Sequence, residues 1–356
     1  MNDHSLGFLK RLLNTPGPSG FETAAARVWR DEASTFADQV EKDVSGNTWA
    51  LLGEGGAPRV MLAGHIDEIG LMLTHIDDEG FLYLEGIGGW DPQGMVGQRV
   101  RLLTREGEIV GVIGKKPIHL IKPDERDKAS KLTDLWIDVG AKTREEAEKR
   151  GIRVGDPGVL DTQLIQLGDD LIASRSIDNR IGAFVVLEAL RLLDAGERPA
   201  AQVAAVATAQ EEIGHSGGGA RTAAFRLDPQ VAIVVDVTFA TDAPGLEKKE
   251  LGDHRLGGGP VLSRGSAAHP IVFEKLAAVA DSEKIPYTIA ASPRFSSTDA
   301  DAIYLSRAGV ATGIVSVPNR YMHSPNEIVS LTDLERAAQL IAAFVRSLDA
   351  TTDFVP

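Results

Sequence analysis

Three short apolar runs constrain the fold of this chain most strongly. They cover residues 59–64, 202–208 and 231–235 and contain few polar side chains. Strands with continuous apolar sequence are buried on both faces, which is typical of α/β proteins with helices on both sides of a sheet. The pattern therefore predicts a mixed sheet flanked by helices. Helices are predicted over residues 5–13, 21–37, 180–193, 270–282 and 331–348.

This α/β pattern is interrupted in the first half of the chain. Short segments with alternating apolar and polar residues appear there, separated by Gly and Asp turns, with one short helical stretch at residues 143–150. We expect a β-rich, barrel-like insert over residues 73–167, and a discontinuous α/β domain formed by residues 1–72 and 168–356. The predicted strands of the insert are residues 81–84, 98–103, 108–113 and 135–139.

Composition excludes several classes of protein. The net charge of -14 would repel nucleic acid and anionic membrane surfaces, so neither is expected as a partner. The chain has no cysteine, so any metal must be held by His, Asp and Glu side chains. No apolar stretch approaches the roughly 18 residues that span a bilayer, and the first residues do not resemble a secretory signal. A cytoplasmic location is the resulting expectation.

Acidic and histidine side chains follow the ends of all three apolar runs. Ligands of α/β proteins bind at the carboxyl ends of the strands, so these side chains are expected at one site. Each has an ordinary structural explanation when taken alone. Several carboxylates gathered at one sheet edge, however, would repel each other unless cations neutralised them. The residues are His65, Asp67, Glu211, Glu212 and Asp236.

Two further residues complete a ligand set for two metal ions. Asp178 precedes a predicted helix, where a helix N-cap is the ordinary role, and His323 follows another apolar run. If Asp178 bridges, one ion takes His65, Asp178 and Asp236. The other takes Asp178, Glu212 and His323. Each ion keeps room for water, as in a catalytic zinc site, and the same ligands also suit cobalt and manganese.

Two acids are left for roles other than metal binding. Asp67 lies two residues after His65, so in extended backbone both side chains point the same way. Its carboxylate is expected to accept the proton on the non-ligating nitrogen of His65. Glu211 is adjacent to the ligand Glu212, so its side chain diverges and remains available as a general base.

These motifs resemble the tetrahedral aminopeptidase family of dinuclear metallopeptidases, which includes glutamyl and deblocking aminopeptidases and some members labelled endoglucanase. The resemblance implies peptide substrates with a free N-terminus and the same metal ligands, base and orienting acid as above. It also implies that the insert is an oligomerisation domain and that the chain forms a hollow homo-dodecamer. The matching segments are AGHIDEIG (63–70), SIDNRIGA (176–183), AQEEIG (209–214), VVDVT (234–238), STDA (297–300) and RYMHSP (320–325).

The chain departs from the family pattern at two places. After the paired glutamates, His215 and Ser216 interrupt the usual turn, and Ser296 and Ser297 replace the two glycines that usually precede the Thr-Asp-Ala motif. None of these positions is a proposed ligand. The departures are therefore expected to affect substrate preference rather than the chemistry.

Three other functions fit parts of the sequence. Residues 214–218 match the G-x-S-x-G nucleophile elbow of serine hydrolases, with Ser216 as nucleophile and Asp299 and His323 in the required order. An endoglucanase would use two carboxylates but has no need for two histidines. A non-catalytic, metal-stabilised assembly would retain the ligands but has no use for Glu211. The metallo-aminopeptidase hypothesis explains the five proposed ligands, Glu211 and Asp67 together.

Overall fold

The computed structural model describes residues 1–214 and 217–356. Its central sheet is mixed, as predicted. The middle strands β12, β3, β13 and β16 run parallel to each other, whereas β2 and β14 pair with this group in the antiparallel direction. The order across the sheet is β1 (Gln39–Lys42), β2 (Thr48–Leu52), β12 (Gln202–Thr208), β3 (Arg59–His65), β13 (Val231–Phe239), β16 (Ala311–Asn319), β14 (Val261–Arg264) and β15 (Thr288–Ala291).

The three apolar runs of the sequence form adjacent strands in the middle of this sheet. β3 pairs with β12 on one side and with β13 on the other, so their carboxyl ends lie at the same edge. In this register His65 lies opposite Thr208. β13 is longer than predicted and continues to Phe239, so Asp236 lies within the strand, opposite Ser316 of β16.

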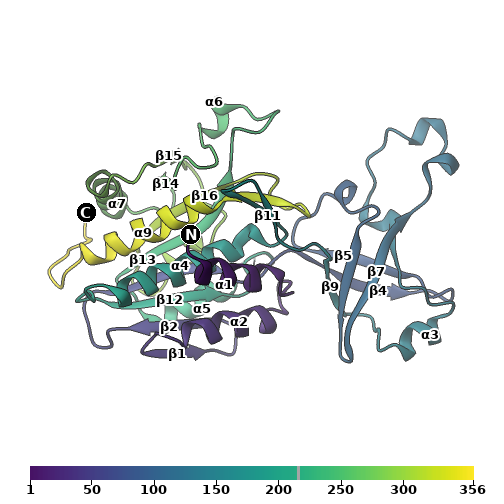
Figure 1. Cartoon of the computed structure of the whole chain (residues 1–356), viewed down its shortest axis with the longest axis horizontal. Helices are drawn as coiled ribbons and strands as arrows, with labels where there is room; N and C mark the ends of the chain where they lie inside the picture. Colours follow the sequence, from purple (N-terminus) through teal and green to yellow (C-terminus); the bar gives the residue numbers. More distant parts are fainter. Residues whose placement is uncertain (215–216) are drawn as a thin grey trace.

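Helices cover both faces of the sheet (Figure 1). Side chains from α1, α2, α4, α7 and α9 form the apolar core on one face, and those of α5 and α8 pack on the other. Within the described ranges, no helix is long and apolar enough to cross a membrane. The helices are α1 (Asp3–Asn14), α2 (Thr23–Ala33), α3 (Arg144–Lys149), α4 (Ile177–Ala195), α5 (Gly218–Leu227), α6 (Lys248–Leu251), α7 (Pro270–Glu283), α8 (Ala300–Ile303) and α9 (Leu331–Arg346).

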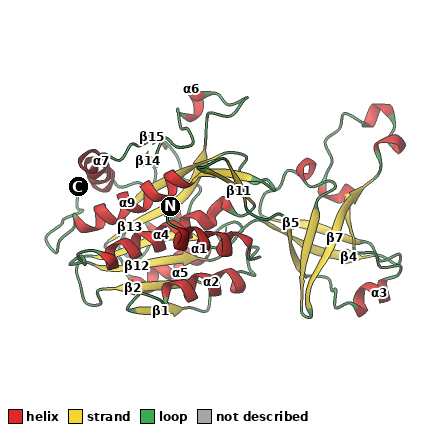
Figure 2. Ribbon diagram, in the orientation of Figure 1, coloured by secondary structure: helices red, strands yellow, loops and turns green. Residues whose placement is uncertain are grey.

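The insert forms a closed barrel with its own apolar core, beside the helix-flanked sheet (Figure 2). Its first strand begins at Gly70, a few residues before the expected start of the insert, because the chain enters the barrel directly from the loop that follows His65. The order around the barrel is β4 (Gly70–Ile76), β5 (Leu82–Ile87), β8 (Leu135–Asp138), β7 (Gly107–Lys115), β6 (Arg99–Thr104) and β9 (Pro157–Leu160).

A small antiparallel sheet was not predicted, but it brings two distant segments together. It has the order β10 (Ile165–Leu167), β11 (Leu171–Ser174) and β17 (Glu327–Ser330). β11 leads into α4, and β17 follows the loop that contains His323. Because Ser174 pairs with Glu327, this sheet places the start of α4 beside that loop.

Candidate metal centre

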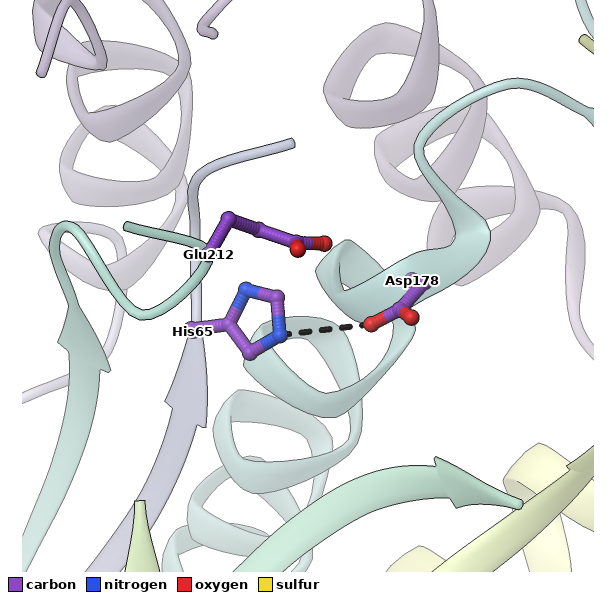
Figure 3. Close-up of side chains that lie close together, drawn as sticks. All are labelled: His65, Asp178 and Glu212. Carbon is purple, nitrogen blue, oxygen red and sulfur yellow. Dashed lines mark ion pairs between the residues drawn. The ribbon is translucent and has the colours of Figure 1, made fainter. Parts of the chain in front are cut away.

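His65 and Asp178 meet where the end of β3 packs against the start of α4. At Gly64, a Cβ atom would lie 2.4 Å from the carbonyl carbon of Gly182, so only glycine permits this close approach of strand and helix. Both side chains are buried. The His65 Nε2 atom lies 3.3 Å from Asp178 Oδ1, and a dashed line marks this pair in Figure 3.

The second oxygen of Asp178 faces the second histidine. Asp178 Oδ2 lies 3.3 Å from His323 Nε2, which in turn lies 3.4 Å from Glu212 Oε1. The other ring nitrogen of His323 is 2.9 Å from the carbonyl oxygen of Gly89 in the insert. A proton on Nδ1 donated to this carbonyl leaves Nε2 free as a ligand. The two oxygens of Asp178 thus face two different imidazoles, which is the arrangement that a bridging carboxylate needs.

Asp67 lies on the opposite side of the His65 ring. Its Oδ1 atom is 3.4 Å from His65 Nδ1, which is the expected nitrogen but a longer separation than in a good hydrogen bond. The carboxylate also accepts the backbone N–H groups of Glu211 and Glu212, at 3.2 and 3.1 Å. Asp67 therefore contacts the turn that carries both glutamates, a contact that the sequence analysis did not predict.

The remaining two acids lie further from the ring of His65. Asp236 Oδ1 is 4.0 Å and Glu211 Oε2 is 3.8 Å from His65 Nε2. All seven residues singled out from the sequence are thus brought together at one edge of the sheet. Glu211 also lines a cavity of about 950 Å³, which is large enough to receive peptide side chains. The cavity is further lined by residues that include Arg221, Phe225, Asp299, Leu305 and Arg307.

Burial and neighbouring charges perturb the ionisable groups of this cluster strongly. Burial opposes ionisation of Asp178, but His323 and His65 lower its pKa to about 2. Hydrogen bonds to Asp178 and Glu212 raise the pKa of His323 to about 11. Burial, followed by the charges of neighbouring carboxylates, raises the pKa of Glu211 to about 10 despite the opposing effect of His65. Divalent cations beside Glu211 would reverse this effect and favour its ionised form.

The donor set fits divalent cations. Ligand atoms of His65, Asp178 and Glu212 all lie within 4.8 Å of one another. Glu212 Oε1 is a buried oxygen that makes no hydrogen bond of good geometry among the described residues, because its neighbour His323 Nε2 lies 3.4 Å away. Such an atom is costly unless a cation satisfies it. Imidazole and carboxylate ligands suit zinc and related transition metals.

Two buried acids at the site were not assigned to it from the sequence. Asp299 accepts a hydrogen bond from Thr208 at 2.5 Å and lines the same cavity as Glu211. Glu327 accepts the backbone N–H groups of Asp178 and His323. Asp299 lies within the segment STDA (297–300), and Glu327 lies two residues after RYMHSP (320–325). This proximity to the matching segments could have indicated both acids as site residues. The serine-hydrolase hypothesis concerns Ser216, which lies with His215 outside the described residues.

Two imidazoles and a group of buried carboxylates beside a cavity, at one edge of an α/β sheet, are typical of a metal-dependent hydrolase. Comparison with known proteins identifies the family. Residues 46–340 match the model of the M42 glutamyl aminopeptidase family. The chain is 38% identical to the lysyl aminopeptidase of Pyrococcus furiosus over 351 residues, which cover 98% of each chain.

Solved structures agree with this match. A TET aminopeptidase from a marine sediment thaumarchaeon superposes with a TM-score of 0.92 at 36% identity, covering 98% of this chain and 97% of that one. A TET peptidase from Pyrococcus horikoshii gives a TM-score of 0.85 at 32% identity, covering 97% and 100%. The chain therefore belongs to the M42 family and is a metal-dependent aminopeptidase, as the sequence motifs predicted.

Proposed function

We propose that this aminopeptidase removes N-terminal residues from peptides by means of two divalent ions bridged by Asp178. The observation that carries this proposal is the arrangement of Asp178, whose two oxygens each lie 3.3 Å from a different histidine. His65 and Asp236 would complete one ligand set, and Glu212 and His323 the other. When bound, such ions polarise the scissile carbonyl and acidify a water molecule.

Glu211 is the general base in this proposal. Its carboxylate lies near His65 and faces the cavity, so it can contact both water and substrate. Glu211 takes a proton from the attacking water while the water oxygen bonds to the carbonyl carbon. When the carbon–nitrogen bond breaks, Glu211 gives this proton to the leaving amine. Asp67 lies on the other side of the His65 ring and is the orienting acid in this proposal. It contacts the non-ligating nitrogen of His65 and accepts the backbone N–H of Glu211.

Zinc is the proposed native ion, with cobalt or manganese as functional substitutes. We expect a chelator to abolish hydrolysis of an aminoacyl p-nitroanilide and any of these ions to restore it. In the metal-free chain His323 is protonated at neutral pH, because Asp178 and Glu212 raise its pKa to about 11. A metal ion must displace that proton, so reconstitution should require less metal at pH 8 than at pH 6.

The matched control for this experiment is the same protein taken through the procedure without chelator. It should keep its metal and hydrolyse the substrate at the original rate. Metal analysis must show that the chelated protein is free of metal. If that metal-free protein kept full activity, the proposal would be contradicted.

The departures at Ser296 and Ser297 are proposed to affect substrate preference. Both backbone N–H groups donate to the carboxylate of Asp301, at 3.0 and 2.8 Å. Ser297 has a φ of 57°, a conformation that glycine adopts more readily. Ser297 and Asp301 both line the cavity beside Glu211. The hydroxyl of Ser296 lies 2.9 Å from the hydroxyl of Thr298, which also lines the cavity. Glycines would lack both serine side chains, and this difference supports an effect on the shape of the substrate pocket.

We also propose that the chain assembles into a homo-dodecamer through its barrel insert. The Pyrococcus horikoshii TET peptidase assembles into a tetrahedron or a large octahedral shell, and a structure at 32% identity is a dodecamer. Apolar side chains on the outside of the barrel support the same role here. Val110 and Val112 of β7 are 54% and 47% exposed, and the turn that follows exposes Ile118 and Leu120.

Light scattering on the purified protein tests this assembly. We expect a mass about twelve times the 38.0 kDa of one chain. Replacing both Val110 and Val112 by lysine should lower the mass, because charge would be buried at the interface. Val44→Lys is the control, since this valine is fully exposed on the turn between β1 and β2, outside the barrel. A wild-type mass near that of one chain, unchanged by added metal, would refute the assembly and leave the chemistry intact.

A further inference from the structure

Glu327 joins the backbones of two proposed metal ligands that are far apart in the sequence. One carboxylate oxygen accepts the N–H of Asp178 at 2.9 Å, and the other accepts the N–H of His323 at 2.9 Å. The side chain is only 2% exposed, so both contacts are shielded from water.

Neither ligand has a regular backbone conformation that would hold it without help. Asp178 departs from helical geometry within α4, with φ -77° and ψ 109°. His323 has a φ of 59°, in the left-handed region that most residues avoid. Surrounding contacts must therefore keep these two residues in place, and Glu327 contacts both.

Glu327 is itself carried by well-ordered structure. It begins β17 and pairs with Ser174 of β11, the strand that leads into α4. The next residue, Ile328, exchanges backbone hydrogen bonds with Arg320 at 3.0 Å in both directions. The carboxylate is thus fixed with respect to both chain segments that it holds.

The other ligand-bearing turn is held in the same way by a different acid. Asp67 accepts the N–H groups of Glu211 and Glu212 with its two oxygens. Each side of the ligand cluster therefore has one buried carboxylate that joins two backbone N–H groups. By contrast, His65 ends β3 and is held by pairing with β12, not by Glu327.

We infer that Glu327 is a positioning residue that sets the separation of Asp178 and His323, and thereby the affinity of one of the two metal pockets. This inference rests on the proposed two-metal site. The metal pocket whose affinity depends on Glu327 is the one formed by Asp178, Glu212 and His323. The pocket that contains His65 depends on it less, because only the shared ligand Asp178 contacts Glu327.

The test is a metal titration of the metal-free Glu327→Gln variant, followed by calorimetry. Glutamine keeps one acceptor oxygen but presents an NH₂ group to the second backbone N–H, so one contact is lost. We expect one ion to bind as in the wild type and the other about 10- to 100-fold more weakly, the usual effect of losing a group that orients a ligand. Activity should return when metal is raised to saturation, with KM unchanged.

Asp333→Asn provides a matched control. Asp333 is a buried carboxylate that also accepts two backbone N–H groups, from Gly257 and Gly259 at 2.7 Å each, but neither glycine is a ligand. A purely structural role for Glu327 predicts that both variants lose thermal stability and keep normal metal binding. That result, or an equal loss of metal affinity in both variants, would overturn the inference.

A measurement on the wild type makes the test independent of how well the variant folds. In the metal-free protein, hydrogen exchange should show protected amides at Asp178 and His323. Rapid exchange at both would overturn the positioning role. If the wild type binds no pair of metal ions, the proposed function fails instead, and amide protection still decides whether Glu327 holds the two residues.

Discussion

Replacing Asp178 by asparagine is expected to abolish peptide hydrolysis and to remove most of the bound metal. Among the described residues, Asp178 is the acid that pairs with both His65 and His323, so its two oxygens would be shared by both ions in the proposed site. Asparagine offers one neutral oxygen and an NH₂ group, which cannot bridge two cations. Metal content measured by mass spectrometry and turnover of an aminoacyl p-nitroanilide should therefore fall together.

Asp194→Asn is a suitable control for this variant. Asp194 pairs with Arg198 at 2.6 Å on the protein surface, at the opposite end of α4 from Asp178. Its replacement should leave metal content and turnover unchanged. An Asp178→Asn protein that kept two tightly bound ions and normal turnover would show that the bridged site is wrong.

Glu211→Gln is expected to lower kcat by roughly 10²- to 10⁴-fold, the usual contribution of a general base. Glutamine has nearly the same shape but cannot take a proton from water. Because Glu211 is not a proposed ligand, both metal ions should remain. Kinetics at saturating substrate, together with metal analysis of the same sample, measure the two effects separately.

The neighbouring variant Glu212→Gln tests whether the two roles are assigned correctly. Glu212 lies 3.4 Å from His323 and is a proposed ligand, so its replacement should lower metal content. Equal loss of metal in both variants would mean either that the roles are exchanged or that both glutamates bind.

The central part of the fold was predictable because burial leaves a strong pattern in the sequence. The three apolar runs became β3, β12 and β13, since strands covered on both faces need continuous apolar side chains. The edge strand β1 was missed, because its side chains are exposed or only partly buried and show no apolar face. The helix α5 was also missed, since its glycines and alanines carry only a weak helical periodicity.

The ligands could be proposed from the sequence because each follows or lies near a predicted strand or helix end. The contacts that hold these ligands in place could not be proposed from the sequence. Glu327 acts through backbone N–H groups, which every residue has, so no residue type at Asp178 or His323 indicates the contact. Gly89 contributes a carbonyl oxygen from the insert, and the path of the insert back to the site depends on tertiary structure.

Diffraction from crystals grown with zinc, with anomalous data collected at the zinc edge, tests the central claim most directly. The two-metal proposal predicts two anomalous peaks in each subunit, roughly 3.5–4 Å apart, with the carboxylate of Asp178 between them. One peak should lie beside His65 and Asp236, and the other beside Glu212 and His323. A single peak, or two peaks that do not share Asp178, would contradict the account.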